Sequence, residues 1–199
     1  MRALKCLDLL KTAYTMGHRL SKIYTRTGDD GTTGLGDGSR TEKSSARMWA
    51  IGEIDELNCA LGQVLSHDVR NDVRELLVDI QHDLFDLGGE LSIPGSGFIT
   101  ADVVAKLETA IDRYNEELPP LKEFVLPGGG HSGAAAHLAR AVCRRAERRL
   151  FAMDSEQPLN EHSIHFINRL SDLLFVVARI TARDSGAGEV MWQRGKDRQ

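Results

Sequence analysis

The sequence predicts an all-α fold: an up-and-down bundle of about five helices with a glycine-rich, non-helical N-terminal segment. Three observations support this prediction. From Ser44 onward, apolar residues recur three and four positions apart, which is the spacing of one face of an α-helix. Short breaks that contain proline and glycine separate these stretches. Alternating apolar and polar runs, which are typical of strands, are almost absent, and no internal repeat is present.

The first two helices are expected at about 44–67 and 69–91. The second is expected to end near Gly88 and Gly89, before a loop over 92–97. Their apolar faces consist of Ile51, Ile54, Leu57, Leu61 and Val64 in the first helix and of Val73, Leu76, Leu77, Ile80, Leu84 and Leu87 in the second.

The third helix is expected to start after Thr100, as its N-cap, and to stop at Pro119 and Pro120. A short extended piece over 124–126 follows, and then the run PGGG at 127–130, which we expect to be non-helical.

The fourth helix is expected at about 132–154 and the fifth at about 160–184, with Asn160 as the cap of the fifth. The fourth should bury Ala139, Val142, Cys143, Ala146 and Leu150. The fifth is apolar nearly all round, which indicates a central helix. Its apolar residues are Phe166, Ile167, Leu170, Leu173, Leu174, Phe175, Val177 and Ile180.

Composition indicates one sizeable domain without a membrane span. The chain has 199 residues, of which 41% are hydrophobic, and no apolar run approaches the roughly 18 residues that a span needs. A net charge of −4 gives no general attraction for nucleic acid or an anionic membrane. Three scattered cysteines favour reduced thiols in a cytoplasmic protein. We expect residues 1–15 to be a disordered appendage, Met16 to be the natural start, and residues 16–199 to form the domain.

The segment 23–40, IYTRTGDDGTTGLGDGSR, is too polar and too rich in glycine to form a core. Such a loop can bring backbone N–H groups and hydroxyls to a phosphate chain. It is not a Walker A loop, because no GK[ST] follows. By composition alone, a solvated turn remains the alternative. Arg26 near the start of the segment and Lys43 just after its end favour phosphate binding.

The fourth helix carries five arginines in the stretch ARAVCRRAERR. At about 100° per residue, Arg140, Arg144, Glu147 and Arg148 share one face, opposite the residues expected to be buried. Guanidinium groups bind phosphate in a bidentate manner. A polyphosphate ligand would explain why repelling charges are stacked there, and a solvated face with ordinary ion pairs is the alternative.

Polar residues follow one side of the otherwise apolar fifth helix: His165, Asn168, Asp172, Arg179 and Arg183. Buried charges must be paired or meet a ligand. We expect Asp172 and Arg179 to belong to a structural network, and Asn168 to be the ligand-binding residue. A di-iron site is not expected, because the chain has no Glu-x-x-His motif, and we predict no protein-held transition metal.

Five motifs occur in order: YTRTGDDGTT, AIGEIDELN, FVLPGGG, ARAVCRRAERR and FINRLSD. In these motifs the chain resembles the PduO-type ATP:cob(I)alamin adenosyltransferases, from about Ile23 to Arg183. The resemblance implies a homotrimer of five-helix bundles that moves the 5′-deoxyadenosyl group of ATP to Co(I) of cobalamin or a related corrinoid, with triphosphate as the other product. The N-terminal extension and Trp192 in the C-terminal tail depart from the family pattern.

The resemblance also implies residue roles. An ion pair between Asp55 and Arg140 is implied across the subunit boundary, and Phe124, followed by Val125 and Leu126, is implied beneath the corrin ring. ATP binding is implied for Thr25, Arg26, Thr27, Gly28, Thr33, Gly34, Lys43, Arg144, Arg145, Ala146, Glu147, Arg148 and Asn168. We assign catalysis to Asp55, Phe124, Arg140 and Arg144. Mg²⁺ would accompany the triphosphate, and a reductase and an adenosylcobalamin-dependent enzyme would be partners.

Two other functions fit the residues alone. The loop and the arginines would also suit another ATP-dependent enzyme, such as a phosphotransferase or a nucleotidase. A trimeric scaffold or corrinoid carrier would need neither of them.

Overall fold

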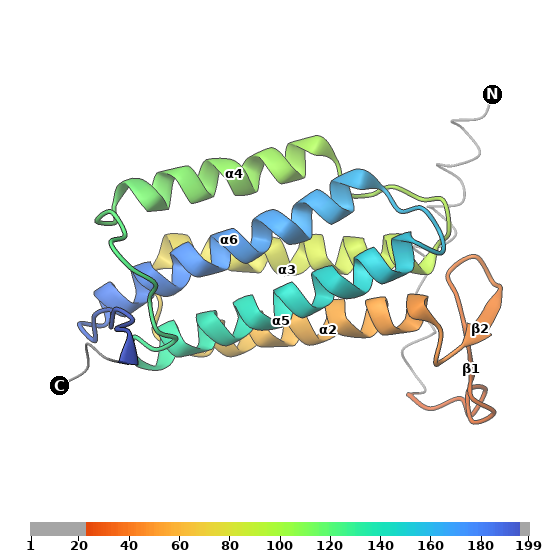
Figure 1. Ribbon diagram of the computed structural model, residues 1–199. Helices are drawn as coiled ribbons and strands as arrows, with labels where there is room; N and C mark the ends of the chain where they lie inside the picture. Colours follow the sequence, from red (N-terminus) through yellow and green to blue (C-terminus); the bar gives the residue numbers. More distant parts are fainter. Residues whose placement is uncertain (1–22, 196–199) are drawn as a thin grey trace.

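A computed structural model describes residues 23–195 of the chain. Five helices run up and down, each antiparallel to the helix before it (Figure 1). They are α2 (Ala46–Leu65), α3 (Asn71–Ser92), α4 (Ala101–Glu116), α5 (Gly130–Asp154) and α6 (Glu161–Asp184). The predicted five-helix bundle is confirmed. The expected appendage and the start at Met16 lie outside the described residues.

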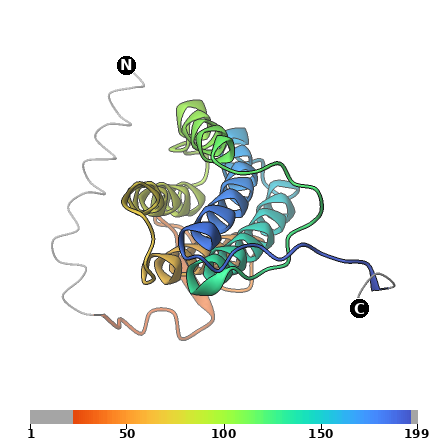
Figure 2. The same ribbon diagram turned by 90° about the vertical axis from the view of Figure 1, so that its left-hand side faces the viewer.

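Helix α6 forms the centre of the core, as its sequence predicts. It has more buried residues than any other described helix, and it packs against α5 and α4. Leu170, Leu173 and Leu174 are fully buried, and each contributes roughly 1.5–3 kcal/mol by leaving water. Figure 2 views the bundle end-on and shows α6 with the other helices around it. None of the helices described within residues 23–195 has the length and apolarity needed to cross a membrane.

Several helix boundaries differ from those expected by a few residues, and two of them involve glycines that the sequence analysis placed outside the helices. Helix α3 continues through Gly88 and Gly89 to Ser92, because Leu87 and Leu91 are both buried and hold this turn on the core. Helix α5 begins at Gly130, two residues before the expected start.

Both residues expected as N-caps occupy N-cap positions, but only one of them makes a capping hydrogen bond with its side chain. Asn160 caps α6, since its side chain accepts a hydrogen bond from the N–H of His162 at 3.1 Å. Thr100 occupies the N-cap position of α4 without a capping bond from its side chain.

The N-terminal segment contains a small hairpin that the sequence analysis missed. Strands β1 (Thr32–Gly34) and β2 (Arg40–Glu42) pair antiparallel. Strands of three residues are too short to show alternation, which explains the omission. In the turn, the N–H of Gly36 donates to the carbonyl of Ser92 at 2.8 Å. The hairpin is therefore attached to the end of α3.

A buried carboxylate joins three segments at the same end of the bundle. Glu90 is 5% exposed and accepts hydrogen bonds from the N–H groups of Phe98 (2.5 Å) and Ile99 (3.0 Å). It also accepts from Asn160 Nδ2 at 3.2 Å and from the hydroxyl of Ser163. The loop after α3 and the start of α6 are thereby fixed to each other.

The turn before α5 requires glycine at position 129. Gly129 has φ 85°, and a Cβ there would lie 2.3 Å from Cβ of Ala182 on α6. We expect Gly129→Ala to lower the free energy of unfolding by roughly 2–4 kcal/mol, because backbone strain and overpacking add. Urea denaturation at fixed protein concentration measures this.

Gly62→Ala in α2 is the matched control. Its Cβ would meet only Gln81 Nε2, at 3.7 Å, so stability should stay constant or rise by up to about 1 kcal/mol. Equal urea midpoints for wild type and Gly129→Ala would show that the turn tolerates a side chain.

Candidate functional site

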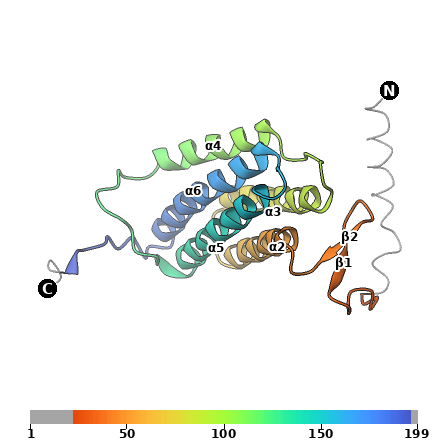
Figure 3. The same ribbon diagram turned by 45° about the vertical axis from the view of Figure 1, so that its right-hand side comes forward.

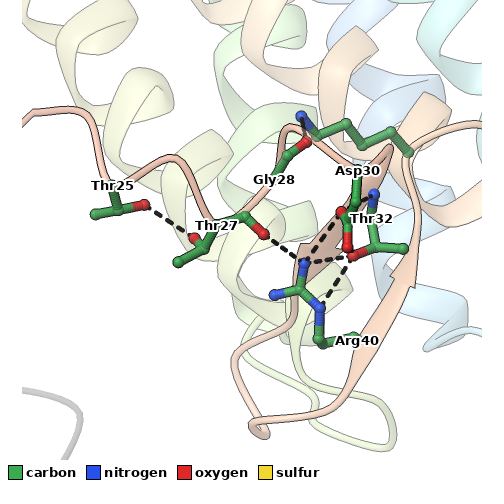
Figure 4. Close-up of polar contacts among 7 residues, drawn as sticks. Thr25, Thr27, Gly28, Asp30, Thr32 and Arg40 are labelled. Carbon is green, nitrogen blue, oxygen red and sulfur yellow. Dashed lines mark hydrogen bonds and ion pairs between the residues drawn. The ribbon is translucent and has the colours of Figure 1, made fainter.

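The loop before β1 is held in place by Arg40 and Asp30. Arg40 Nη2 donates to the carbonyl of Thr27 at 2.7 Å, and Arg40 Nε donates to Thr32 Oγ1 at 3.0 Å (Figure 4). The carboxylate of Asp30 accepts from the N–H and the hydroxyl of Thr32, at 2.9 and 2.8 Å. The hydrogen bond from the Thr32 N–H is the main cause that lowers the pKa of Asp30. The loop is thus ordered although it is exposed.

The predicted phosphate-binding residues of this segment lie close together. The hydroxyls of Thr25 and Thr27 are 2.9 Å apart, and Lys43 Nζ donates to the carbonyl of Gly28 at 2.7 Å. Arg26 between them has the positive φ of 63°. Thr33 and Gly34 belong to the adjoining strand β1. Hydroxyls, backbone groups and an ammonium group gathered on one exposed loop suit a polyphosphate.

The arginines of α5 form two stripes. The first consists of Arg145 and Arg149 and contacts α2, and the second consists of Arg140, Arg144 and Arg148. Arg145 Nε donates to Glu53 at 2.5 Å, and its Nη2 donates to Glu56. These hydrogen bonds raise the pKa of Arg145. Arg149 lies 3.8 Å from Glu53, and its guanidinium stacks 4.9 Å from the ring centre of Trp49.

Lys43 lies beside the side chains that contact Arg145 and Arg149. A hollow of about 310 Å³ is lined by Lys43, Trp49, Glu53 and Glu56, among others. The lysine of the loop and the carboxylates that hold Arg145 therefore share one surface. Sequence reasoning missed Trp49, Glu53 and Glu56. The only signal for the two carboxylates is their spacing of three within the motif AIGEIDELN.

The second stripe faces α6 and agrees with the predicted grouping. Asn168 Nδ2 donates to Glu147 at 2.7 Å, and Arg148 donates to the carbonyl of Arg144 at 2.8 Å. Arg144 and Arg148 are exposed. Arg140 is half-buried, and its Nε has no hydrogen-bond partner within the described residues. The stripe therefore offers guanidinium groups with free donors.

Ala146 belongs to neither stripe. It is fully buried, as the apolar side of the predicted helix requires, so its side chain packs in the core.

The structural network expected for Asp172 and Arg179 on α6 is present for only one of them. Arg179 is buried and forms an ion pair with Glu189 at 2.6 Å, as predicted. The same prediction is wrong for Asp172, which is exposed and has no bonded partner among residues 23–195. His165 and Arg183 are also exposed, because the helix turns these positions away from α5 and α4.

Phe124 lies outside the core. It is 78% exposed, which excludes core packing as its role. Its carbonyl accepts a hydrogen bond from the N–H of Trp192 at 2.7 Å, and the N–H of Leu126 donates to the carbonyl of Val190 at 2.8 Å. The extended piece 124–126 therefore forms a two-stranded ribbon with the segment 190–192.

Side chains alternate between the two faces of such a ribbon. Phe124, Leu126, Val190 and Trp192 thus share one face, and all four are exposed. Val125 pairs with Met191 and points to the other face, where it is half-buried. The apolar face suits a flat, apolar ligand, and Val125 lies behind it.

A family model described as cobalamin adenosyltransferase matches residues 23–181. The chain belongs to this family. It is 56% identical over 183 residues to a cobalamin adenosyltransferase of Cupriavidus metallidurans, and the match covers 92% of this chain and all of the relative. It is 43% identical to a corrinoid adenosyltransferase of Bacillus subtilis, over 87% of this chain and 93% of the relative.

Solved structures agree with this membership. A variant of a PduO-type ATP:corrinoid adenosyltransferase from Lactobacillus reuteri, complexed with cobalamin and ATP, superposes with a TM-score of 0.82. It is 33% identical, and the match covers 87% of this chain and all of the other. The resemblance predicted from the five motifs is confirmed.

In this cobalamin adenosyltransferase family member, the two parts of the candidate site lie at opposite ends of the bundle. Figure 3 shows the β1–β2 hairpin beyond one end and the C-terminal segment at the other. The arginine stripes on α5 lie between them. Across residues 23–195, no group of three or more His, Cys, Asp or Glu side chains is placed to hold a metal ion.

Proposed function

We propose that this cobalamin adenosyltransferase family member transfers the 5′-deoxyadenosyl group of ATP to Co(I) of cobalamin or a related corrinoid. The observation that carries the proposal is the family match over residues 23–181. The site supports it from both sides, since an ordered polar loop with arginines suits the nucleotide and an exposed apolar ribbon suits the corrin.

The reaction is a nucleophilic substitution at the 5′-carbon of ATP. The electron pair of Co(I) forms the cobalt–carbon bond, and the 5′ carbon–oxygen bond breaks with its electrons going to triphosphate. Co(I) is already a strong nucleophile, so the protein supplies no base. Its task is to hold the 5′-carbon over cobalt and to stabilise charge on the leaving triphosphate.

The loop residues Thr25, Arg26, Thr27 and Gly28 are proposed to wrap the ATP, together with Thr33 and Gly34 of β1. Lys43, Arg144, Arg145 and a Mg²⁺ bound to the triphosphate neutralise the leaving group. Arg148 and the Asn168–Glu147 pair, at 2.7 Å, line the nucleotide. Arg145 already donates to Glu53 and Glu56 through Nε and one N–H of Nη2, so it offers phosphate the two N–H groups of Nη1 and the second N–H of Nη2.

Phe124 is proposed to lie beneath the corrin and to keep the lower axial position of cobalt empty. Co(II) without an axial ligand is easier to reduce to Co(I). The phenyl ring suits this role because it is 78% exposed and has no lone pair to offer. Leu126 extends the same face.

A homotrimer is proposed because the protomer leaves two opposite charges unpaired. Neither Asp55 nor Arg140 has an ion pair within the described part of the chain. Asp55 lines a largely apolar groove of about 450 Å³ between α2 and α3, beside Phe85, which is 72% exposed. A second protomer seated in this groove would cover Phe85 and pair its Arg140 with Asp55.

We also propose a cellular compartment, protein partners and domain limits for this protein. Cys59 and Cys143 are free thiols, which fits a reducing cytoplasm. A reductase that supplies the electron and an adenosylcobalamin-dependent enzyme that takes the product are its proposed protein partners. Residues 1–15 are proposed to be an appendage outside the domain 16–199.

One assay tests the function against its alternatives. Reduced cobalamin, ATP and Mg²⁺ are mixed with the protein, and the spectrum of the cobalt–carbon product and the phosphate products are followed. Adenosylcobalamin with triphosphate supports adenosyl transfer. ADP or pyrophosphate would indicate a phosphotransferase or nucleotidase, and bound corrinoid without turnover would indicate a carrier.

We expect Arg144→Lys to lower kcat/KM by about 10²-fold or more, because an ammonium cannot form two parallel N–H···O contacts with a phosphate. Steady-state kinetics with varied ATP measures it. Arg183→Lys is the control, since Arg183 is exposed on α6 and outside the proposed site. If the Arg144→Lys enzyme matched wild type, the bidentate contact would have to be abandoned.

Mixed trimers test whether sites form between subunits. Asp55→Ala and Arg144→Ala proteins should each be inactive, because each loses one side of every site. Unfolding and refolding them together should restore part of the activity, since some junctions then combine two intact surfaces. An active monomer in light scattering, or no recovery in a mixture shown to co-assemble, would overturn the shared site.

Phe124→His tests the role of the apolar lower face. Imidazole is similar in size but carries a lone pair that can occupy the axial position, and much of it is unprotonated at neutral pH. We expect a large loss of activity from cob(II)alamin with a weak reductant, and a much smaller loss from pre-reduced cob(I)alamin. ATP affinity should stay constant. An electron paramagnetic resonance spectrum with as much four-coordinate Co(II) as wild type would remove Phe124 from this role.

A further inference from the structure

A charged side chain lies buried in the last turns of α6. Arg179 and its partner Glu189 are only 2% and 7% exposed. Arg179 Nε donates to Glu189 Oε1 at 2.6 Å, and its Nη2 donates to the carbonyl of Pro119 at 2.9 Å. One guanidinium therefore holds two segments that lie outside the helices, one after α4 and one after α6.

These two segments lead into the strands of the exposed ribbon. The chain runs from Pro119 to the strand 124–126, and from Glu189 directly into the strand 190–192. The strands are joined by two backbone hydrogen bonds, from Trp192 to Phe124 at 2.7 Å and from Leu126 to Val190 at 2.8 Å. So short a ribbon is not stable by itself. Its position has to come from elsewhere, and Arg179 contacts the approach to both strands.

We propose that Arg179 and Glu189 are positioning residues for the corrinoid: their buried ion pair sets the C-terminal segment against the Phe124 segment, so that both strands present one apolar face. The inference rests on the proposed function, which places the corrin on Phe124. It adds that the shape of this face is controlled from inside the bundle, by residues that touch no ligand.

Stability alone does not explain the pair. Replacing a buried ion pair with apolar residues of similar volume is often neutral or stabilising. Only a planar guanidinium can donate in fixed directions to a carboxylate and a carbonyl on separate segments. The ion pair therefore determines the relative position of the two segments, whereas apolar substitutes would only fill the space.

The experiment compares two variants. Glu189→Gln leaves Arg179 without its charge partner, and we expect it to raise KM for cobalamin by about 10- to 100-fold, as misplacement at a site does. KM for ATP should change less than about twofold, because the arginine stripes are unaffected. The double variant Arg179→Met with Glu189→Met should keep a wild-type melting temperature and show the same loss toward cobalamin.

A disulfide tests position directly. Val125 and Met191 face each other, and the hydrogen bonds of the ribbon flank this pair, so their side chains approach closely. Val125→Cys with Met191→Cys, oxidised in the Glu189→Gln background, should restore at least half of the loss in cobalamin KM. Reduction of the bridge should abolish the rescue. A bridge confirmed by mass that restores nothing would contradict a positioning role.

Two controls separate the possible outcomes. Asp72→Asn breaks the half-exposed ion pair with Arg70 (2.9 Å) at the start of α3, and it should leave cobalamin KM unchanged. Phe124→Ala should raise cobalamin KM if the corrin lies on the ribbon. If Phe124→Ala raises it and the double methionine variant does not, the inference on Arg179 fails alone. If Phe124→Ala has no effect, the proposed corrinoid site itself fails.

Discussion

Because most of α6 is buried, each polar group on its buried faces must find a partner inside the protein or in a ligand. At its start, Asn160 and Ser163 bind the buried carboxylate of Glu90. At its end, Arg179 binds Glu189 and the carbonyl of Pro119. The hydrogen bonds of the polar groups on α6 thus determine where the loops at both ends of the bundle lie. Between the ends, Asn168 donates a hydrogen bond to Glu147 of α5.

The parts of the proposed site are spread along the length of the bundle. The loop around Thr27 and the ribbon at Phe124 lie at opposite ends of the protomer, with the arginines of α5 between them (Figure 1). The loop is ordered by its own contacts, whereas the position of the ribbon is proposed to depend on Arg179 and Glu189. A site that uses all of them would draw on surfaces of neighbouring protomers, which is the arrangement proposed above from the unpaired charges of Asp55 and Arg140.

The helices and the family could be predicted from sequence because both signals are long or repeated. A buried face such as that of α6 repeats over more than six turns, and five motifs occur in one order. The hairpin was missed because three residues are too few to show a period. The division of the arginines was missed because the partners of Arg145 depend on how α2 packs against α5. The partner of Phe124 is also distant in the chain, and only the fold brings Trp192 beside it.

The bond between Lys43 and Gly28 has a consequence for the entropy of ligand binding. An ammonium group has three donors, and the carbonyl of Gly28 takes one of them at 2.7 Å. Lys43 can therefore hold the loop and bind a phosphate oxygen at the same time. The freedom of the lysine chain, about 2 kcal/mol when fully mobile, is restricted largely on folding and not on binding. A nucleotide bound at this loop, as proposed, would meet a side chain already in position, and more of the charge attraction would be retained as affinity.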